Sequence, residues 1–456
     1  MLIASISHTI KVISVPAIIK YAEGLSWFQG EALFSGNKLY SSVNDYPWIY
    51  TTYPPVGPLI FGAAMKIFGG SLITLRTTVL LFEILIAVFV FLYLKYKTKD
   101  NILGISIGIF TFLIFATHEF HSLARIDFIY LFFNLATFYF FTRFFKKQDL
   151  KNMILTIIFF NITFLTKQPG IFLLIPFLTT IFYKKKNFIV FNIATIVTTL
   201  IVYIILNLAT SFGLFQHTII YQFASGKCSI PSRIKIEAIK FLVIFILGAV
   251  STLYLGFKKN MPIKVFFISN LLWAVLSVRK CGADSNYLLE PMLYGLLITG
   301  LAINKLKKQK NIKTIYAIIL LTLILTLTIV FVPGNKLTKD DIIFRFNATK
   351  AVKQAVDNNR ETIISEEPYY GFVNNKDVIL LDPFQYSKLF GKRYADSVKF
   401  INYLKNNNLT YIIAGNRLKK YIPGISALLE ERYKPITPMI KNEDLSVVVY
   451  KLIDAE

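Results

Sequence analysis

An apolar run that ends in a Lys-rich turn, ILIAVFVFLYLKYKTK at residues 84–99, is the stretch of sequence that decides the fold. It closes a predicted membrane span over residues 74–94, because a helix needs about 20 apolar residues to cross a bilayer. The same alternation continues from residue 1 to residue 333. The Lys-rich turns fall at every second break between spans, as expected for cytoplasmic loops. These turns are 95–99, 146–147, 184–186, 258–259 and 305–308.

We therefore predict an α-helical polytopic membrane protein with about eleven transmembrane helices. Two long external loops, at 21–58 and 209–236, interrupt the series. An apolar helix at 57–69 is too short to span and is expected to lie in the membrane interface. With the N-terminus inside and an odd number of spans, the chain after residue 333 lies outside. The predicted spans are residues 2–20, 74–94, 102–118, 127–143, 152–166, 170–183, 188–208, 238–256, 263–279, 287–303 and 314–333.

The composition excludes a soluble protein, since 55% of the 456 residues are hydrophobic and the mean hydropathy is +0.55. The formal net charge of +24 could suggest a nucleic-acid partner. Residues 1–333, however, hold 31 Lys and Arg against 11 Asp and Glu, a net charge of +20. Because the excess belongs to the membrane part, we expect no nucleic-acid partner but contact between basic loops and anionic lipid headgroups.

The tail, residues 334–456, has a different pattern. Helical stretches alternate with short β-like runs, which predicts a small soluble α/β domain. At this length the tail can bury its own core. The expected helices are 343–358, 395–407 and 424–432, and the expected strands are 362–364, 378–381, 411–414 and 447–450.

The two cysteines, Cys228 and Cys281, have no spacing typical of a zinc or redox site. Both fall in predicted external loops, so a disulfide is open, but we expect two unpaired thiols. No small-residue cleavage site follows the apolar N-terminus, so no cleavable signal peptide is expected.

Most acids of the membrane part fall on the predicted external side. A carboxylate there does not set the orientation of the chain in the membrane and is energetically costly near the bilayer, so such a cluster indicates a functional site. Glu23 follows the first span and is a candidate catalytic base or metal ligand, with an ordinary interfacial acid as the alternative. Asp127 begins a span and forms an Arg-x-Asp pair with Arg125, which suits a phosphate or sugar hydroxyl. His118 and His121 do not have the four-residue spacing of the zinc motif, so packing is the expected role.

Two external breaks carry cations against the positive-inside rule. Lys167 interrupts one apolar run, and an anionic headgroup would explain its position; snorkelling to the interface is the alternative. Arg279 and Lys280 open the polar cluster at 279–291, where a lipid-linked phosphate would meet them. The same cluster offers hydrogen bonds suited to sugar hydroxyls. These come from Asn286, Tyr287 and Glu290.

With these residues the chain resembles the membrane glycosyltransferases of the GT-C type. The likeness is to the family 39-like branch, which includes protein O-mannosyltransferases and the aminoarabinose transferases that act on lipid A. The motifs keep their order over most of residues 1–333, and as a set they are more specific for the superfamily than for a substrate. They are Glu23-Gly24, Gly36-x-x-Leu39-Tyr40, Tyr53-Pro54-Pro55, Arg125-x-Asp127, Thr166-Lys167-Gln168 and Asn286-Tyr287-Leu288-Leu289-Glu290-Pro291.

The resemblance implies inverting transfer of a sugar from a polyprenyl-phosphate donor to an envelope acceptor, in the plasma (inner) membrane with the active site outside. Glu23 would match the family's first-loop acid, taken as the catalytic base or acceptor contact. Asp127 is the other candidate catalytic residue. Arg125, Lys167 and the pair Arg279-Lys280 would contact the lipid phosphate. Many relatives carry Asp-Glu where this chain has Ala22-Glu23, so a divalent metal cofactor stays open.

Two alternatives remain at this point: a transporter or lipid flippase with an external domain, and a binding-only relative. Polar residues gather at span ends on one side, whereas transporters usually place them near the bilayer midplane. The sequence does not specify the sugar, the acceptor (protein, lipid or glycan), the prenyl length or the oligomeric state.

Overall fold

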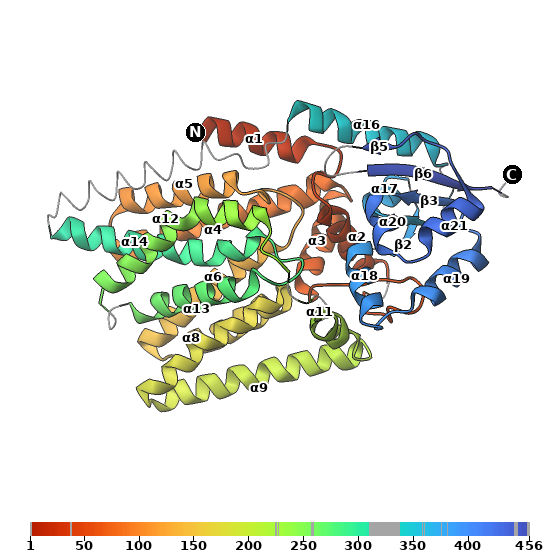
Figure 1. Ribbon diagram of the computed structural model, residues 1–456. Coiled ribbons are helices and arrows are strands. Elements are labelled where there is room, and N and C mark those ends of the chain that lie inside the picture. The colour runs from red at the N-terminus through yellow and green to blue at the C-terminus, as the bar shows by residue number, and fades with distance from the viewer. Residues whose placement is uncertain are drawn as a thin grey trace.

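The computed structural model describes residues 2–36, 39–223, 226, 228–256, 260–309, 338–357, 359, 361–374, 376–380, 382–441 and 446–453. The predicted span at 314–333 and the Lys258-Lys259 turn lie outside the described residues. We call residues 2–309 the helical region and residues 338–453 the C-terminal α/β region. In Figure 1 the long helices of the helical region run side by side, and the C-terminal α/β region lies at one end of them.

The helical region has helices at every predicted span that is described. Within the described residues, five helices are long and apolar enough to cross a membrane by length and composition, namely α4, α6, α9, α12 and α14, and five further apolar helices are shorter. The protein is therefore polytopic, while the total of eleven spans stays a prediction. The longer elements are α1 (Leu2–Ser14), α2 (Ala22–Phe34), α3 (Val56–Phe68), α4 (Leu72–Thr98), α5 (Asn101–Thr117), α6 (Asp127–Lys147), α7 (Leu150–Thr166), α9 (Lys186–Ala209), α12 (Ser232–Tyr254), α13 (Met261–Ser277) and α14 (Leu289–Lys308). The shorter ones are η1 (Gln168–Leu173), α8 (Leu174–Leu178), η2 (Thr179–Tyr183), α10 (Gly213–Phe215), η3 (Gln216–Ile220), α11 (Tyr221–Phe223) and η4 (Ser285–Leu288).

Contacts link the described Lys-rich turns at one end of the helices. Lys307 Nζ pairs with Asp100 at 2.7 Å, which joins the turn after α4 to the end of α14. Asn187 Nδ2 donates to the carbonyl of Gln148 at 3.4 Å, which joins the turn after α6 to the start of α9. The separation of Lys-rich turns from candidate site residues that the sequence predicted is therefore also a separation in space. The described Lys-rich turns lie at one end of the helices, and the candidate site residues lie toward the opposite end.

The segment expected to be the first long loop, residues 21–58, is partly helical. It contains α2, which crosses α3 closely. A Cβ on Gly62 would lie 2.4 Å from the carbonyl oxygen of Gly30, so only glycine allows this approach. The helix was missed because its two internal glycines weaken the local signal, while its stability comes from packing against α3.

The C-terminal α/β region contains a mixed sheet of order β2-β1-β3-β6-β4, with β5 paired to β6. Strand β1 runs parallel to β2 and β3, whereas β3 and β4 run antiparallel to β6. The four predicted strand runs coincide with β1, β2, β3 and β6. The elements are α16 (Lys339–Ala355), β1 (Thr362–Ser365), α17 (Pro368–Phe372), β2 (Asp377–Ile379), α18 (Pro383–Gly391), α19 (Ser397–Asn407), β3 (Tyr411–Ala414), α20 (Asn416–Tyr421), α21 (Ile425–Arg432), β4 (Tyr433–Pro435), β5 (Ile440–Lys441) and β6 (Ser446–Leu452).

The two regions pack through α2 and the segment between α1 and α2. Arg345 Nη1 of α16 donates to the carbonyl of Ile18 at 3.1 Å, and Tyr369 Oη donates to the carbonyl of Pro16 at 2.5 Å. A Cβ on Gly24 would lie 2.9 Å from the backbone nitrogen of Tyr369. The C-terminal α/β region therefore sits directly on the segment that carries Glu23.

Cys228 and Cys281 form a disulfide, so the expectation of two unpaired thiols is wrong. Their Cα atoms are 4.9 Å apart although 53 positions separate them in the chain. Cys228 precedes α12 and Cys281 follows α13, and both helices pack against α14, so the disulfide joins the start of α12 to the end of α13. No spacing rule in the sequence could have indicated this pairing.

We predict that the purified, unreduced protein reacts with no maleimide under denaturing conditions, because both thiols are bonded. After reduction, two thiols should react, as a mass shift on a denaturing gel would report. Labelling of two thiols without reduction would contradict the disulfide.

Candidate active site

Asp127 is the centre of a buried cluster of charged and polar side chains. Asp127 is 3% exposed, and its carboxylate accepts three hydrogen bonds from side chains. Arg125 Nε donates to Oδ2 at 2.9 Å, Lys167 Nζ donates to Oδ1 at 2.7 Å, and Asn286 Nδ2 donates to Oδ1 at 2.6 Å. The loop before α6, the end of α7 and η4 thus meet on one carboxylate.

Local structure explains why these four side chains converge. Asp127 is the first residue of α6 and Lys167 is the C-cap of α7, so an antiparallel helix pair brings them to the same end. Gly57 of α3 packs on Ile126, where a Cβ would lie 2.7 Å from Cγ2. Gln168 Nε2 donates to the carbonyl of Thr52 at 2.5 Å, which ties the end of α7 to the first loop.

Aromatic rings surround the two cations of this cluster. The Lys167 ammonium lies 5.2 Å from the ring centroid of Tyr287 and 5.6 Å from that of Tyr130. The Arg125 guanidinium lies 3.7 Å from the ring centroid of Phe120. Such contacts stabilise a cation that has lost part of its water, so both side chains are held as charged groups.

The electrostatics favour two charged cations here. Burial acts to lower the pKa of Lys167, but Asp127 and other nearby oxygens raise it overall. The pKa of Arg125 is raised in the same way, with Asp127 again the main opposing charge. Lys280 differs, because burial and the positive charge of Lys167 lower its pKa to about 8. Its Nζ donates to Gln222 Oε1 at 2.7 Å.

Two buried acceptor atoms next to the cluster lack a hydrogen-bond donor within the described part of the chain. They are Asn286 Oδ1 and Glu290 Oε2. Glu290 is 2% exposed and lies close enough to Lys167 to interact with its charge. Buried acceptors are normally satisfied, so unsatisfied ones indicate a place where a ligand or water donates.

Glu23 lies in a second buried ion pair with Arg76, and both side chains are fully buried. Arg76 donates from Nε to Oε1 at 2.7 Å and from Nη2 to Oε2 at 2.8 Å. The backbone nitrogens of Ile19 and Ala124 also donate to this carboxylate, at 2.7 and 3.1 Å. Arg76 further binds the carbonyls of Val12, Val15 and Ala17.

This geometry does not fit the expected role of Glu23 as an accessible base. Burial acts to raise its pKa, but Arg76 and the backbone donors lower it overall, so the carboxylate holds a proton poorly. Its oxygens fix Arg76 and the backbone at Ala124, directly before Arg125. Sequence reasoning missed Arg76 because nothing in a single apolar run shows which partner a buried cation has.

A further buried carboxylate, Glu83, holds the loop between α5 and α6. It accepts from the backbone nitrogen of Ser122 at 2.8 Å and pairs with His121 Nδ1 at 2.8 Å. His118 stacks on Phe241, in line with the expected packing role. Within the described residues, no group of three or more His, Cys, Asp or Glu is arranged to hold a metal ion.

The remaining predicted residues differ in whether they belong to the Asp127 cluster. Tyr287 and Glu290 line the cluster, and Lys280 lies at its edge, as described above. Arg279 is exposed, and its backbone carbonyl accepts from Cys228. The structure therefore brings together seven of the nine predicted residues and leaves Glu23 and Arg279 outside this cluster.

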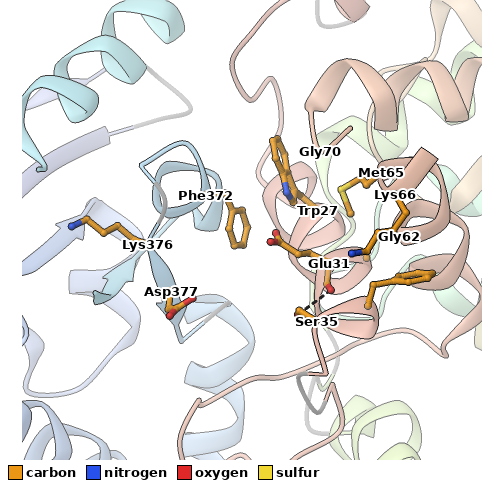
Figure 2. A pocket seen from close by; sticks show the side chains of 12 residues that line it. Trp27, Glu31, Ser35, Gly62, Met65, Lys66, Gly70, Phe372, Lys376 and Asp377 are labelled. Atoms are coloured by element: carbon orange, nitrogen blue, oxygen red, sulfur yellow. Dashed lines mark hydrogen bonds between the residues drawn. The ribbon is translucent and has the colours of Figure 1, made fainter. Parts of the chain in front are cut away.

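A separate cavity of about 530 Å³ lies between α2, α3 and the C-terminal α/β region. Figure 2 shows Trp27, Glu31 and Lys66 on one side of it, with Phe372 and Asp377 on the other. It lies along the far part of α3, whereas the first turn of α3 touches Ile126 in the Asp127 cluster. The cavity and the charged cluster are therefore distinct places.

Comparison with known proteins agrees with this architecture. Residues 52–212 match the model of the dolichyl-phosphate-mannose-protein mannosyltransferase family. The crystal structure of ArnT from Cupriavidus metallidurans bound to undecaprenyl phosphate superposes with a TM-score of 0.62 at 12% identity, over 99% of this chain and 97% of that one. The fold is of the GT-C type.

The apo structure of the same ArnT gives a TM-score of 0.59 at 11% identity, over 98% of this chain and 97% of that one. At this identity the likeness concerns the fold. No curated protein matches the sequence significantly. The GT-C resemblance expected from the motifs is confirmed.

We predict that Glu23→Gln and Arg76→Gln each destabilise the protein. Removing one partner of a buried pair leaves the other charge uncompensated and costs about 3–5 kcal/mol. Thermal unfolding in detergent should show a lower Tm for both variants, with the exposed pair variant Asp45→Asn as the control. A Glu23→Gln variant with unchanged Tm and lost turnover would instead support the base role.

Proposed function

We propose that the protein transfers a sugar from a polyprenyl-phosphate donor to an envelope acceptor, at the external face of the membrane and with inversion. The observation that carries this proposal is the pair of cations, Arg125 and Lys167, held by Asp127 at the helix ends opposite the Lys-rich turns. The match to the mannosyltransferase family model and the fold of an ArnT bound to undecaprenyl phosphate support the donor class.

The cations suit the leaving group of this reaction. When the bond between the sugar C1 and the phosphate oxygen breaks, its electron pair stays on the phosphate. Arg125, Lys167 and Lys280 would bind that phosphate, and preorganised cations of this kind stabilise charge that develops in the transition state. Asp127 would keep Lys167 and Arg125 aligned, so we assign it an organising role.

Glu290 is the carboxylate that we propose as the proton acceptor. Its Oε2 has no donor within the described residues, whereas both oxygens of Asp127 and Glu23 are engaged. An acceptor hydroxyl or amine would attack C1 on the face opposite the phosphate and pass its proton to Glu290. Asn286 and Tyr287 would hydrogen-bond the sugar. The first loop and the C-terminal α/β region would cover this site and contact the acceptor.

A donor panel tests the function. Purified protein is incubated with different polyprenyl-phosphate sugars and an acceptor lysate, and release of free polyprenyl phosphate is measured. We expect release with one donor and a product of inverted anomeric configuration. No release with any donor by folded protein would contradict the proposal.

Two variants test the assigned roles. Glu290→Gln should lower turnover about 100-fold, as expected for loss of a general base, and leave the Tm unchanged. Asp127→Asn should lower turnover about 100-fold or more by releasing the two cations. Glu431→Gln, an exposed acid of the C-terminal α/β region, is the matched control. Wild-type turnover in Glu290→Gln would remove the base assignment.

A separate experiment tests the orientation of the protein in the membrane. The disulfide is typical of an oxidising compartment, and it lies at the end opposite the Lys-rich turns. We therefore expect a C-terminal alkaline phosphatase fusion to be active in cells and a C-terminal green fluorescent protein fusion to be dark. The reverse pattern would place the C-terminal α/β region in the cytoplasm.

A further inference from the structure

The cavity between α2, α3 and the C-terminal α/β region takes no part in the proposed transfer. Its volume of about 530 Å³ is large enough for a small molecule, since such sites measure roughly 300–1,000 Å³. Figure 2 shows Trp27, Glu31 and Lys66 of the helical region facing Phe372 and Asp377 of the C-terminal α/β region. Both regions therefore supply side chains that a bound molecule would contact.

This cavity lies at the level where a membrane span begins. Its lining includes Gly70, two residues before Leu72, the first residue of the apolar helix α4. Ile67 and Phe68, at the end of α3, are 72% and 76% exposed, as expected for side chains that contact lipid. Trp27 packs on Gly70, where a Cβ would lie 3.7 Å from the indole ring. Tryptophan is enriched at membrane–water interfaces, so the cavity lies at the depth of lipid headgroups.

Aromatic rings and carboxylates occur together in the lining. The rings of Trp27 and Phe372 stack with centroids 5.9 Å apart and an interplanar angle of 19°, and we call this pair the aromatic stack. The acids Glu31 and Asp377 line the same cavity from its two sides. Aromatic faces and carboxylates are the groups that attract an organic ammonium ion. The cavity is therefore suited to a ligand with an ammonium group.

The two lysines of the lining differ in their charge balance. The Nζ atom of Lys376 pairs with Asp357 and with Glu361, each at 2.7 Å, so its charge is already compensated. Lys66 is exposed and, within the described part of the chain, forms no ion pair with Glu31 or with any other acid. The helical side of the cavity thus presents one cation and one carboxylate that are not paired with each other. A ligand with one ammonium and one anionic group complements both.

We propose that the cavity binds the headgroup of a zwitterionic phospholipid of the bilayer. Its ammonium group would lie between Glu31 and the aromatic stack, and its phosphate would lie beside Lys66. Its acyl chains would follow the exposed apolar end of α3 into the membrane. The occupant is a bilayer lipid and not the sugar donor, whose phosphate is assigned to Lys167, so this proposal does not depend on the proposed function.

Lipid binding to the delipidated full-length protein in detergent tests the proposal without turnover. The probes are phosphatidylethanolamine, which carries an ammonium group, and phosphatidylglycerol, which does not, with identical acyl chains. Native mass spectrometry gives the affinity of the first lipid bound. The variants are Glu31→Gln and Lys66→Gln, with Glu430→Gln as the matched control. Glu430 is an exposed acid of α21, in the C-terminal α/β region.

We expect the wild type to bind phosphatidylethanolamine about 10-fold more tightly than phosphatidylglycerol, because only the former places an ammonium group on a carboxylate. Glu31→Gln should remove this preference by weakening phosphatidylethanolamine alone. Lys66→Gln should weaken both lipids, since both carry the phosphate. Glu430→Gln should bind both lipids like the wild type.

Equal affinity of the wild type for the two lipids would overturn the proposal. So would a Glu31→Gln variant that binds phosphatidylethanolamine as tightly as Glu430→Gln does. A preference for phosphatidylglycerol that is lost in Lys66→Gln would also overturn it and indicate an anionic lipid instead. Should Glu31→Gln lower the Tm without lipid, Lys66→Gln decides: weaker binding of both lipids supports the site, and unchanged binding overturns it.

Discussion

One carboxylate, that of Asp127, joins side chains from three separate segments of the chain in the proposed active site. A buried carboxylate is costly unless it is paired, and a buried lysine or arginine is equally costly alone. The three contacts from Arg125, Lys167 and Asn286 remove both costs at once, and they do so only when α6, α7 and η4 end at the same level. The position of the cations is therefore a consequence of helix packing, and the packing in turn depends on the charges being matched.

A second frame supports the first. Glu23 and Arg76 bind each other and six backbone groups, which fixes the turn between α1 and α2 against α4 and the backbone just before Arg125. The C-terminal α/β region packs on the same turn through α16 and α17. A carboxylate expected to act on a substrate thus connects three structural units. Both of its oxygens accept hydrogen bonds from the protein, so a structural role accounts for its position.

The sequence indicated much of the candidate site because of the positive-inside rule. Lys167 and Lys280 stood out as cations on the wrong side, and Arg125-x-Asp127 as an acid at a span end. All four lie in or beside the cluster. The alternation of apolar runs and Lys-rich turns likewise predicted the described helices. The features that could not be predicted depend on tertiary contacts. They are the ion pair of Glu23 with Arg76, the disulfide between Cys228 and Cys281, and the hydrogen bond from Lys388 to the carbonyl of Cys281. Helix α2 is a further case, because its glycines are explained only by its close packing against α3.

The most direct test of the account is a cryo-electron microscopy structure in nanodiscs with a bound polyprenyl phosphate. The account predicts phosphate density within hydrogen-bond distance of Lys167 and Lys280, beside an intact Asp127 cluster. A phosphate bound instead at Lys66, in the cavity between α3 and the C-terminal α/β region, would contradict it. In that case the Asp127 cluster would be a structural ion-pair network, and the chemistry would have to be sought along α2 and α3.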